Sequence, residues 1–157
     1  MELYVEYLGN RPIKKRYDTD VGIDLYAYYR GDTKSEREYR FINPGQILPI
    51  SAGIRIAMPL NYWAEVVPRS STLSTWGIYV QPGVIDPGYT GEIFIIVQNI
   101  GRHMIIINKG ERIAQLIVHP RVDMKIVECS SVEDKYKEMI GEHPPRGTKG
   151  FGSTGTS

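Results

Sequence analysis

One acidic residue, Asp86, stands in a setting that suits hydrolytic chemistry. It follows the apolar pair Val84-Ile85 and precedes Pro87-Gly88, a strong turn signal, and the aromatic ring of Tyr89 comes directly after the turn. The apolar run at 93–97 then predicts a second strand, so this stretch predicts a β-hairpin with a carboxylate at its mouth. Glycines within the stretch leave main-chain groups uncovered, which a flat ligand could approach. A plain hairpin with a solvated aspartate is the alternative.

A second group of residues suits phosphate binding. Arg69 precedes Ser70 and Ser71 at the predicted start of a helix, where a guanidinium, hydroxyls and free N–H groups can bind phosphate. Simple helix capping beside a surface arginine is the alternative. Asp24 interrupts an apolar strand and must be solvated or paired there. Gln115 interrupts another strand and either bonds to neighbouring backbone or faces a site.

The composition limits the classes of function. A chain of 157 residues with 41% hydrophobic and 24% charged residues fits one globular domain. The net charge of +1 provides no overall field for nucleic acid or membrane binding. One cysteine, Cys129, excludes an internal disulfide, and three scattered histidines show no zinc-ligand spacing. No apolar run is long enough to span a membrane, and the N-terminus lacks the pattern of a signal peptide.

The elements that would position these residues are mostly short strands. The patterns predict strands at 1–8, 21–29, 47–50, 53–57, 62–67, 83–85, 93–97, 104–107, 113–118 and 122–127. A short helix is expected within 68–77, with Ser70 or Ser71 as the N-cap and Gly77 as its end, and a second at 131–140 with Ser131 as the cap. Residues 30–43 are expected to form an exposed loop or hairpin tip. Ten or more short strands with little helix predict an all-β sandwich or barrel.

The C-terminal segment is rich in glycine, hydroxyls and cations and poor in apolar residues. It is expected either to fray or to become ordered on an anionic ligand and close as a lid. It lacks the sequence of a P-loop. The predicted organisation is a single β-barrel domain at 1–140 followed by a flexible Gly-rich arm at 141–157.

Five stretches, in order along the chain, resemble the five motifs of the trimeric dUTPase family. They are Gly22-Ile23-Asp24-Leu25, Pro68-Arg69-Ser70-Ser71, Gly83 to Glu92, Gly110-Glu111-Arg112-Ile113-Ala114-Gln115, and Arg146 to Gly155. Each stretch alone is weak evidence, whereas five in the right order are specific. The resemblance implies a jelly-roll-like β-barrel that assembles as a three-fold trimer with active sites between subunits, hydrolysing dUTP to dUMP and pyrophosphate.

The resemblance also assigns roles to residues. Asp86 corresponds to the base that activates water for attack on the α-phosphorus, and Tyr89 to the ring that packs under the deoxyribose. The main chain of Gly83, Val84 and Ile85 would read the uracil edge. Arg69, Ser70 and Ser71 would bind phosphate, and Gln115 would contact phosphate and the attacking water. In the arm, Arg146, Gly152, Ser153 and Thr154 would bind the substrate, mainly at the γ-phosphate, and Phe151 would stack on the uracil.

The same resemblance implies Mg²⁺ as the cofactor, with Asp24 orienting it through water molecules. The expected partners are dUTP and further copies of the chain, without stable nucleic-acid or membrane binding. The expected location is the cytoplasm, or the nucleus for a eukaryotic or viral chain. Two alternatives are a dCTP deaminase-like enzyme and a catalytically idle regulatory binder of the same fold. The deaminase reaction requires a glutamate on the strand after the hairpin, where this chain has Ile96.

Overall fold

The computed structural model describes residues 1–9, 12–30 and 38–143. The chain divides into two compact units, Met1–Val122 and Asp123–Ser157, which are described separately. The predicted boundary near residue 140 and the arm that follows it stay a prediction.

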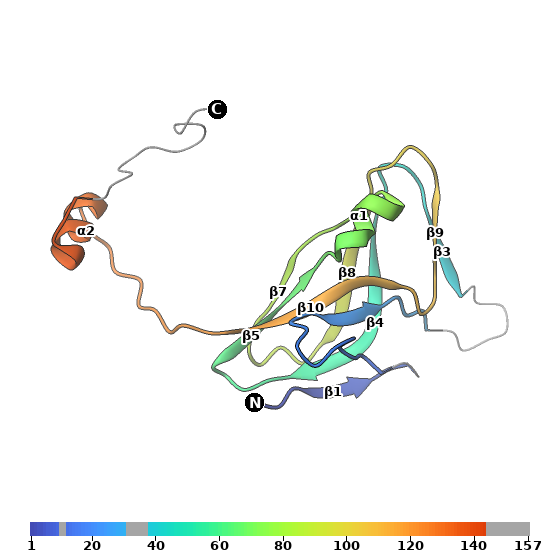
Figure 1. The fold of residues 1–157 in the computed structure, drawn as a ribbon, viewed down its shortest axis with the longest axis horizontal. Coiled ribbons are helices and arrows are strands. Elements are labelled where there is room, and N and C mark those ends of the chain that lie inside the picture. The colour runs from blue at the N-terminus through green and yellow to red at the C-terminus, as the bar shows by residue number, and fades with distance from the viewer. Residues whose placement is uncertain (10–11, 31–37, 144–157) are drawn as a thin grey trace. The chain divides into compact units, whose positions relative to one another are not determined.

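The first unit consists of two four-stranded sheets and a two-stranded ribbon, all with antiparallel pairing (Figure 1). The first sheet has the order β1-β4-β8-β6, with strands Tyr4–Tyr7, Ile47–Ala57, Glu92–Asn99 and Ile78–Val80. The second sheet has the order β2-β10-β5-β7, with strands Ile23–Tyr26, Arg112–Pro120, Tyr62–Val67 and Gly83–Ile85. The ribbon pairs β3 (Tyr39–Ile42) with β9 (Ile105–Asn108). The ten strands formed by the described residues confirm the all-β prediction.

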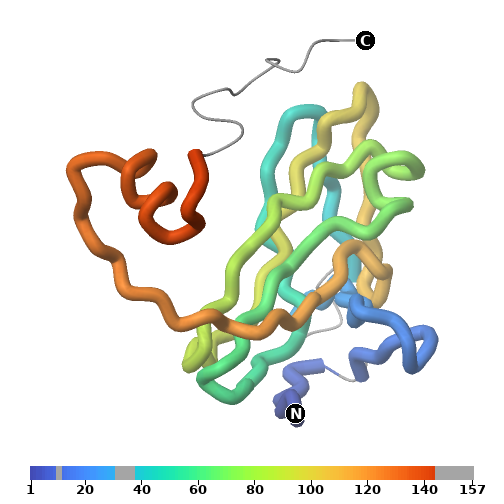
Figure 2. The backbone as a smooth tube through the Cα atoms, turned by 60° about the vertical axis from the view of Figure 1, so that its left-hand side comes forward, coloured from blue at the N-terminus to red at the C-terminus, as the bar shows by residue number. Residues whose placement is uncertain are grey.

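The core lies where the inner faces of the strands meet, and Figure 2 shows β5, β7 and β10 in front of β4 and β8. Along β8, Ile93, Ile95 and Val97 are buried while Phe94 and Ile96 are exposed, as the two-residue period of a strand requires. Burial of each such side chain contributes about 1.5–3 kcal/mol. Because of this alternation, Phe94 and Ile96 are the apolar side chains of β8 that remain available to a ligand on the outer face.

Two predicted strands prove to be one. The expected strands at 47–50 and 53–57 form the continuous β4, which pairs with β1 on one side and β8 on the other. The register of β4 against β8 shifts between Ser51 and Arg55, and Gly53 has φ of 67° there. This bulge absorbs the residues that looked like a break in the sequence.

Two other strand predictions are wrong in opposite directions. Residues 39–42, expected to be part of a loop, form β3 because they pair with β9 and bury Ile42. Residues 122–127, expected to form a strand, are not one in the described chain. Strand formation depends on a partner as well as on an apolar pattern.

The helices α1 (Ser70–Trp76) and α2 (Val132–Ile140) lie where they were predicted. The N-cap of α1 is Arg69, in extended conformation and without a side-chain cap bond, so the expected cap at Ser70 or Ser71 is wrong. Gly77 ends this helix with φ of 65°. Ser131 caps α2 as predicted, since its side chain accepts a hydrogen bond from the Asp134 N–H at 3.1 Å. Neither of these helices has the length and apolar character to cross a membrane, within the residues described.

Candidate active site

Asp86 lies at the start of the connection between β7 and β8, which joins the two sheets. β7 pairs with β5 in the second sheet, whereas β8 pairs with β4 and β6 in the first. The two strands do not pair with each other, so the predicted hairpin is wrong. Instead, β7 pairs with β5 along Ala64–Val66 and so extends the second sheet.

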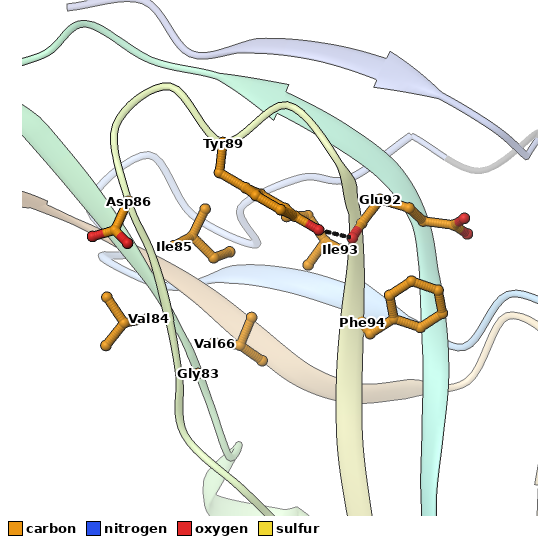
Figure 3. Close-up of a pocket in the computed structure, with 9 residues that line it drawn as sticks. All are labelled: Val66, Gly83, Val84, Ile85, Asp86, Tyr89, Glu92, Ile93 and Phe94. Carbon is orange, nitrogen blue, oxygen red and sulfur yellow. Dashed lines mark hydrogen bonds between the residues drawn. The ribbon is translucent and has the colours of Figure 1, made fainter.

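The turn itself forms as predicted. The Tyr89 N–H donates to the Asp86 carbonyl at 3.2 Å, and Gly88 has φ of 86°, the geometry of a type II turn with proline at its second position. Asp86 is exposed at the end of β7, and its carboxylate projects away from the Tyr89 ring, on the same side of the strand as Val84 (Figure 3). Asp86 is thus open to solvent at the edge of the cavity that it lines.

The first cavity opens between the diverging strands β7 and β8. It has a volume of about 240 Å³ and is lined by Val66, Gly83, Val84, Ile85, Asp86, Tyr89, Glu92, Ile93 and Phe94 (Figure 3). Among the described residues, β7 is the last strand of its sheet, and β8 is bonded on its β6 side only at residues 96–99, by β6 and by the Gln81 N–H. In the described part of the chain, main-chain groups on both walls thus lack a strand partner and can bind a planar polar ligand.

The ring of Tyr89 is held in this cavity at its hydroxyl end. Its hydroxyl donates to the Glu92 carbonyl at 3.1 Å (Figure 3). A Cβ atom on Gly91 would lie 2.5 Å from Cζ of Tyr89, closer than real contacts allow. The Glu92 carboxylate in turn accepts a hydrogen bond from the Ser51 hydroxyl at the bulge of β4. No role was predicted for Glu92 or Ser51, and Gly91 was predicted only to leave main-chain groups uncovered.

The second cavity is cationic. It has a volume of about 300 Å³ and is lined by Arg16, Asp20, Val21, Gly22, Asp24, Arg69, Ser70, Arg112 and Gln115. The structure thus gathers four predicted residues, Asp24, Arg69, Ser70 and Gln115, from three separate motifs. Ser71 is exposed on α1 outside both cavities, so its predicted role is not tested.

Asp24 organises the arginines of the second cavity. One carboxylate oxygen lies 2.9 Å from Nε of Arg69, and the other lies 3.2 Å from Nη1 of Arg112. Of the two alternatives for Asp24, pairing applies: its side chain is 17% exposed and bridges both guanidiniums. The bridge holds two cations side by side, which suits an anionic ligand. Arg112 was missed as a site residue although it belongs to the same motif as Gln115.

Gln115 and α1 are fixed by the main chain around them. The Gln115 side-chain amide donates to the Pro68 carbonyl at 3.0 Å, and a Cβ atom on Gly22 would lie 2.9 Å from its Cδ. Gln115 thus both bonds to backbone and faces a cavity. The buried hydroxyl of Thr72 donates to the Ile113 carbonyl at 3.2 Å, which ties α1 to β10 and so positions Arg69 and Ser70.

The donor set of the second cavity fits magnesium held through water. Asp20 and Asp24 are the carboxylates in its lining, and the described residues contain no group of three side chains that could enclose a metal directly. Each oxygen of Asp24 already accepts from an arginine but keeps a lone pair for a metal-bound water. Mg²⁺ commonly binds through one or two carboxylates together with substrate phosphates.

The remaining predicted residues, Arg146, Phe151, Gly152, Ser153 and Thr154, lie outside the described residues. Within the first unit, the fold and the two cavities define a class: an all-β protein with one cavity walled by open strand edges and another by arginines.

Comparison with known proteins gives the family. The family model for dUTPase matches residues 11–155. The chain is 37% identical to the deoxyuridine 5'-triphosphate nucleotidohydrolase of Caldanaerobacter subterraneus over 137 residues, covering 86% of this chain and 82% of that protein. It is 34% identical to the protein of the same name from Clostridium kluyveri over 160 residues, covering 99% of each. The chain therefore belongs to the dUTPase family, and the prediction of a dUTP diphosphatase enzyme is confirmed.

Solved structures share the fold. A variant of the Staphylococcus bacteriophage 80alpha dUTPase with dUpNHpp matches with a TM-score of 0.82 and 23% identity over 99% of each chain. A variant of the dUTPase from phage phi11 of S. aureus, described for its coordination of a structural Mg(II) ion, matches with a TM-score of 0.74 and 20% identity over 85% of this chain and 99% of that chain. These likenesses confirm the jelly-roll-like β fold.

Proposed function

We propose that the protein hydrolyses dUTP to dUMP and pyrophosphate at sites that form between the subunits of a homotrimer. In each site one chain contributes the cavity with Asp86 and Tyr89, and a neighbouring chain contributes the cationic cavity. The observation that carries this proposal is the distance between the two cavities within one chain.

The strand register gives that distance. Gln115 pairs with Val67 on β5, while Ile85, next to Asp86, pairs with Ala64, which pairs with Val118. Asp86 therefore lies two strands across from Gln115 and four residues along, which separates their Cα positions by about 17 Å in a flat sheet. A base and an amide that act on one water must each lie within about 3 Å of it. Side chains cannot bridge the remaining gap, so one chain does not supply both.

The cavity volumes support the same division. Sites for small molecules usually measure about 300–1,000 Å³. The cavities here measure about 240 and 300 Å³. Each suits one part of a nucleoside triphosphate: the first a base and sugar, the second phosphates.

The reaction follows from the residues in the two cavities. Asp86 accepts a proton from a water molecule whose oxygen attacks the α-phosphorus, and the bond from that phosphorus to the bridging oxygen of pyrophosphate breaks. Free main-chain groups of β7 and β8 pair with the uracil edge, and the narrow gap between the strands excludes bulkier bases. The ring of Tyr89, under the sugar, leaves no room for a 2′-hydroxyl.

The cationic cavity binds the phosphates. Arg69, Arg112 and Ser70 bind phosphate oxygens, and Gln115 orients the water together with Asp86 of the other chain. Asp24 would hold Mg²⁺ through the water shell of the ion, and the bound ion would neutralise part of the phosphate charge. The arm at 141–157 closes over the site as a lid and brings Arg146, Ser153, Thr154 and Phe151 to the nucleotide. A cytoplasmic location stays a prediction.

The base is tested by pyrophosphate release from dUTP with the Asp86→Asn variant. We expect kcat to fall by about 10²–10⁴-fold, the usual contribution of a positioned base. Asp18→Asn is the matched control, because Asp18 is exposed and lines neither cavity. Turnover at the wild-type rate in Asp86→Asn would show that another group activates the water. Ammonia release from dCTP, which the deaminase alternative requires, is expected to be absent.

The division of the site between chains is tested by mixing two inactive variants, Asp86→Asn and Gln115→Ala. If each site takes these residues from different chains, random mixing restores about a quarter of the sites in the trimers. If one chain supplied both residues, every site would keep a defect and no activity would return. The two variants are unfolded together and refolded as a mixture so that their chains assort at random, and sedimentation checks that trimers form.

A further inference from the structure

A segment outside the five motifs forms part of the cationic cavity. Arg16, Asp20 and Val21 line it together with motif residues, although no role was predicted for the connection at 13–20. Asp24 donates its N–H to the Lys14 carbonyl at 3.3 Å, which places this segment along β2. Because β2 is the edge strand of its sheet, the segment forms the outer wall of the cavity.

The turn that follows Arg16 is closed by its own hydrogen bonds. The Tyr17 N–H donates to the Asp20 carboxylate at 2.9 Å, and the Asp20 N–H donates to the Tyr17 carbonyl at 3.0 Å. The Asp20 carboxylate is thus engaged in holding the turn. Local structure therefore fixes the main chain directly after Arg16, which lies at the cavity wall.

Arg16 differs from the other two arginines in its partners. Arg69 and Arg112 share the Asp24 carboxylate. Among the described residues no carboxylate lies within 4.0 Å of the Arg16 guanidinium, whose contact is with the face of the Tyr17 ring at 5.4 Å. Three guanidiniums and two carboxylates line the cavity, so it carries a net positive charge that Arg16 supplies.

We propose that Arg16 binds the phosphates of the substrate that lie farthest from the scissile bond. This rests on the proposed function. From β10 outwards, the cavity offers Gln115, then Asp24 on the edge strand, then Arg16 on the segment beyond it. If Gln115 faces the α-phosphate, a triphosphate that runs outwards meets Arg16 at its distal end. The negative charge of the distal phosphates is larger than the positive charge of one Mg²⁺. The remaining negative charge can pair with Arg16, the guanidinium that has no carboxylate partner among the described residues.

The test compares Arg16→Gln with Lys15→Gln by calorimetric binding. Both variants remove one positive charge from the same exposed segment, but Lys15 does not line the cavity. The probes are dUpNHpp, dUMP and inorganic tripolyphosphate, each with Mg²⁺. We expect Arg16→Gln to weaken dUpNHpp and tripolyphosphate by about 5- to 20-fold and to leave dUMP unchanged. Arg16→Lys should recover part of the loss, since it restores the charge without the planar fork.

Two results would overturn the inference: equal binding of the triphosphate probes by Arg16→Gln and Lys15→Gln, or an equal loss for dUMP, which would indicate a distorted cavity. Failure of the proposed function looks different. In that case the wild type would not prefer dUpNHpp to tripolyphosphate, while the effect of Arg16→Gln on tripolyphosphate would still decide the role of Arg16.

Discussion

Replacement of Gly91 by alanine should weaken the selection of the sugar without touching a reacting atom. The added Cβ would lie 2.5 Å from Cζ of Tyr89, so the ring must move. The main chain of Gly91 does not lie in the left-handed region, so alanine itself introduces no backbone strain there. The substitution therefore acts through Tyr89.

The magnitude follows from the contact that is lost. Moving the ring breaks the hydrogen bond from the Tyr89 hydroxyl to the Glu92 carbonyl, which measures 3.1 Å. Such a bond contributes about 0.5–1.5 kcal/mol, which corresponds to about 2- to 13-fold in kcat/KM for dUTP. Because the displaced ring no longer fills the space beside the sugar, the ratio of kcat/KM for dUTP to that for UTP should fall as well.

The assay is steady-state pyrophosphate release with dUTP and UTP in a double-mutant cycle. In a Tyr89→Ala background the Gly91→Ala change should have little further effect, because the ring that it displaces is gone. An equal effect of Gly91→Ala in both backgrounds would refute the reasoning, as would an unchanged dUTP/UTP ratio. Thermal unfolding of each variant checks that the fold is retained.

Three further outcomes are expected. Gly22→Ala should lower kcat by about 2- to 13-fold, because a Cβ would lie 2.9 Å from Cδ of Gln115 and break its bond to backbone; the change should be silent in Gln115→Ala. Burial of Tyr29, reinforced by Glu111 and opposed by Arg40, raises its pKa from 10.0 to about 12. The neutral Tyr29 side chain therefore contributes fully to the free energy of unfolding below pH 10, and this contribution is lost as the pH rises towards about 12. Denaturant titrations of Tyr29→Phe should lack that loss. Ser131→Ala should destabilise α2 by about 1 kcal/mol, seen as faster amide exchange at 132–140, whereas Ser130→Ala should not.

Local chemistry along the chain specifies several features without information from distant residues. Proline and glycine after Asp86 produce the turn, since proline fixes one dihedral angle and glycine tolerates positive φ. Gly77 ends α1 and Ser131 begins α2 for equally local reasons. Alternating apolar residues indicate the strands of the core. The grouping of Asp24, Arg69, Ser70 and Gln115 was also predicted, through the resemblance of separate motifs.

The pairing of strands was decided by the tertiary structure. β7 pairs with β5 in place of β8, and the pattern of residues 83–97 contains no information about β5. The same applies to β3, whose partner β9 lies more than sixty residues away. Arg112 joined the site because β10 lies beside β2, which brings its guanidinium to Asp24.

The sequence by itself determined that the chain is all-β, that a turn follows Asp86, and which residue types are present to bind phosphate and water. The tertiary structure alone decided that Asp86 and the phosphate-binding residues lie in two separate cavities, at opposite edges of one sheet. The physical reason is that dihedral preferences and alternation act over a few residues, whereas strand order depends on burying the apolar faces of the whole chain at once.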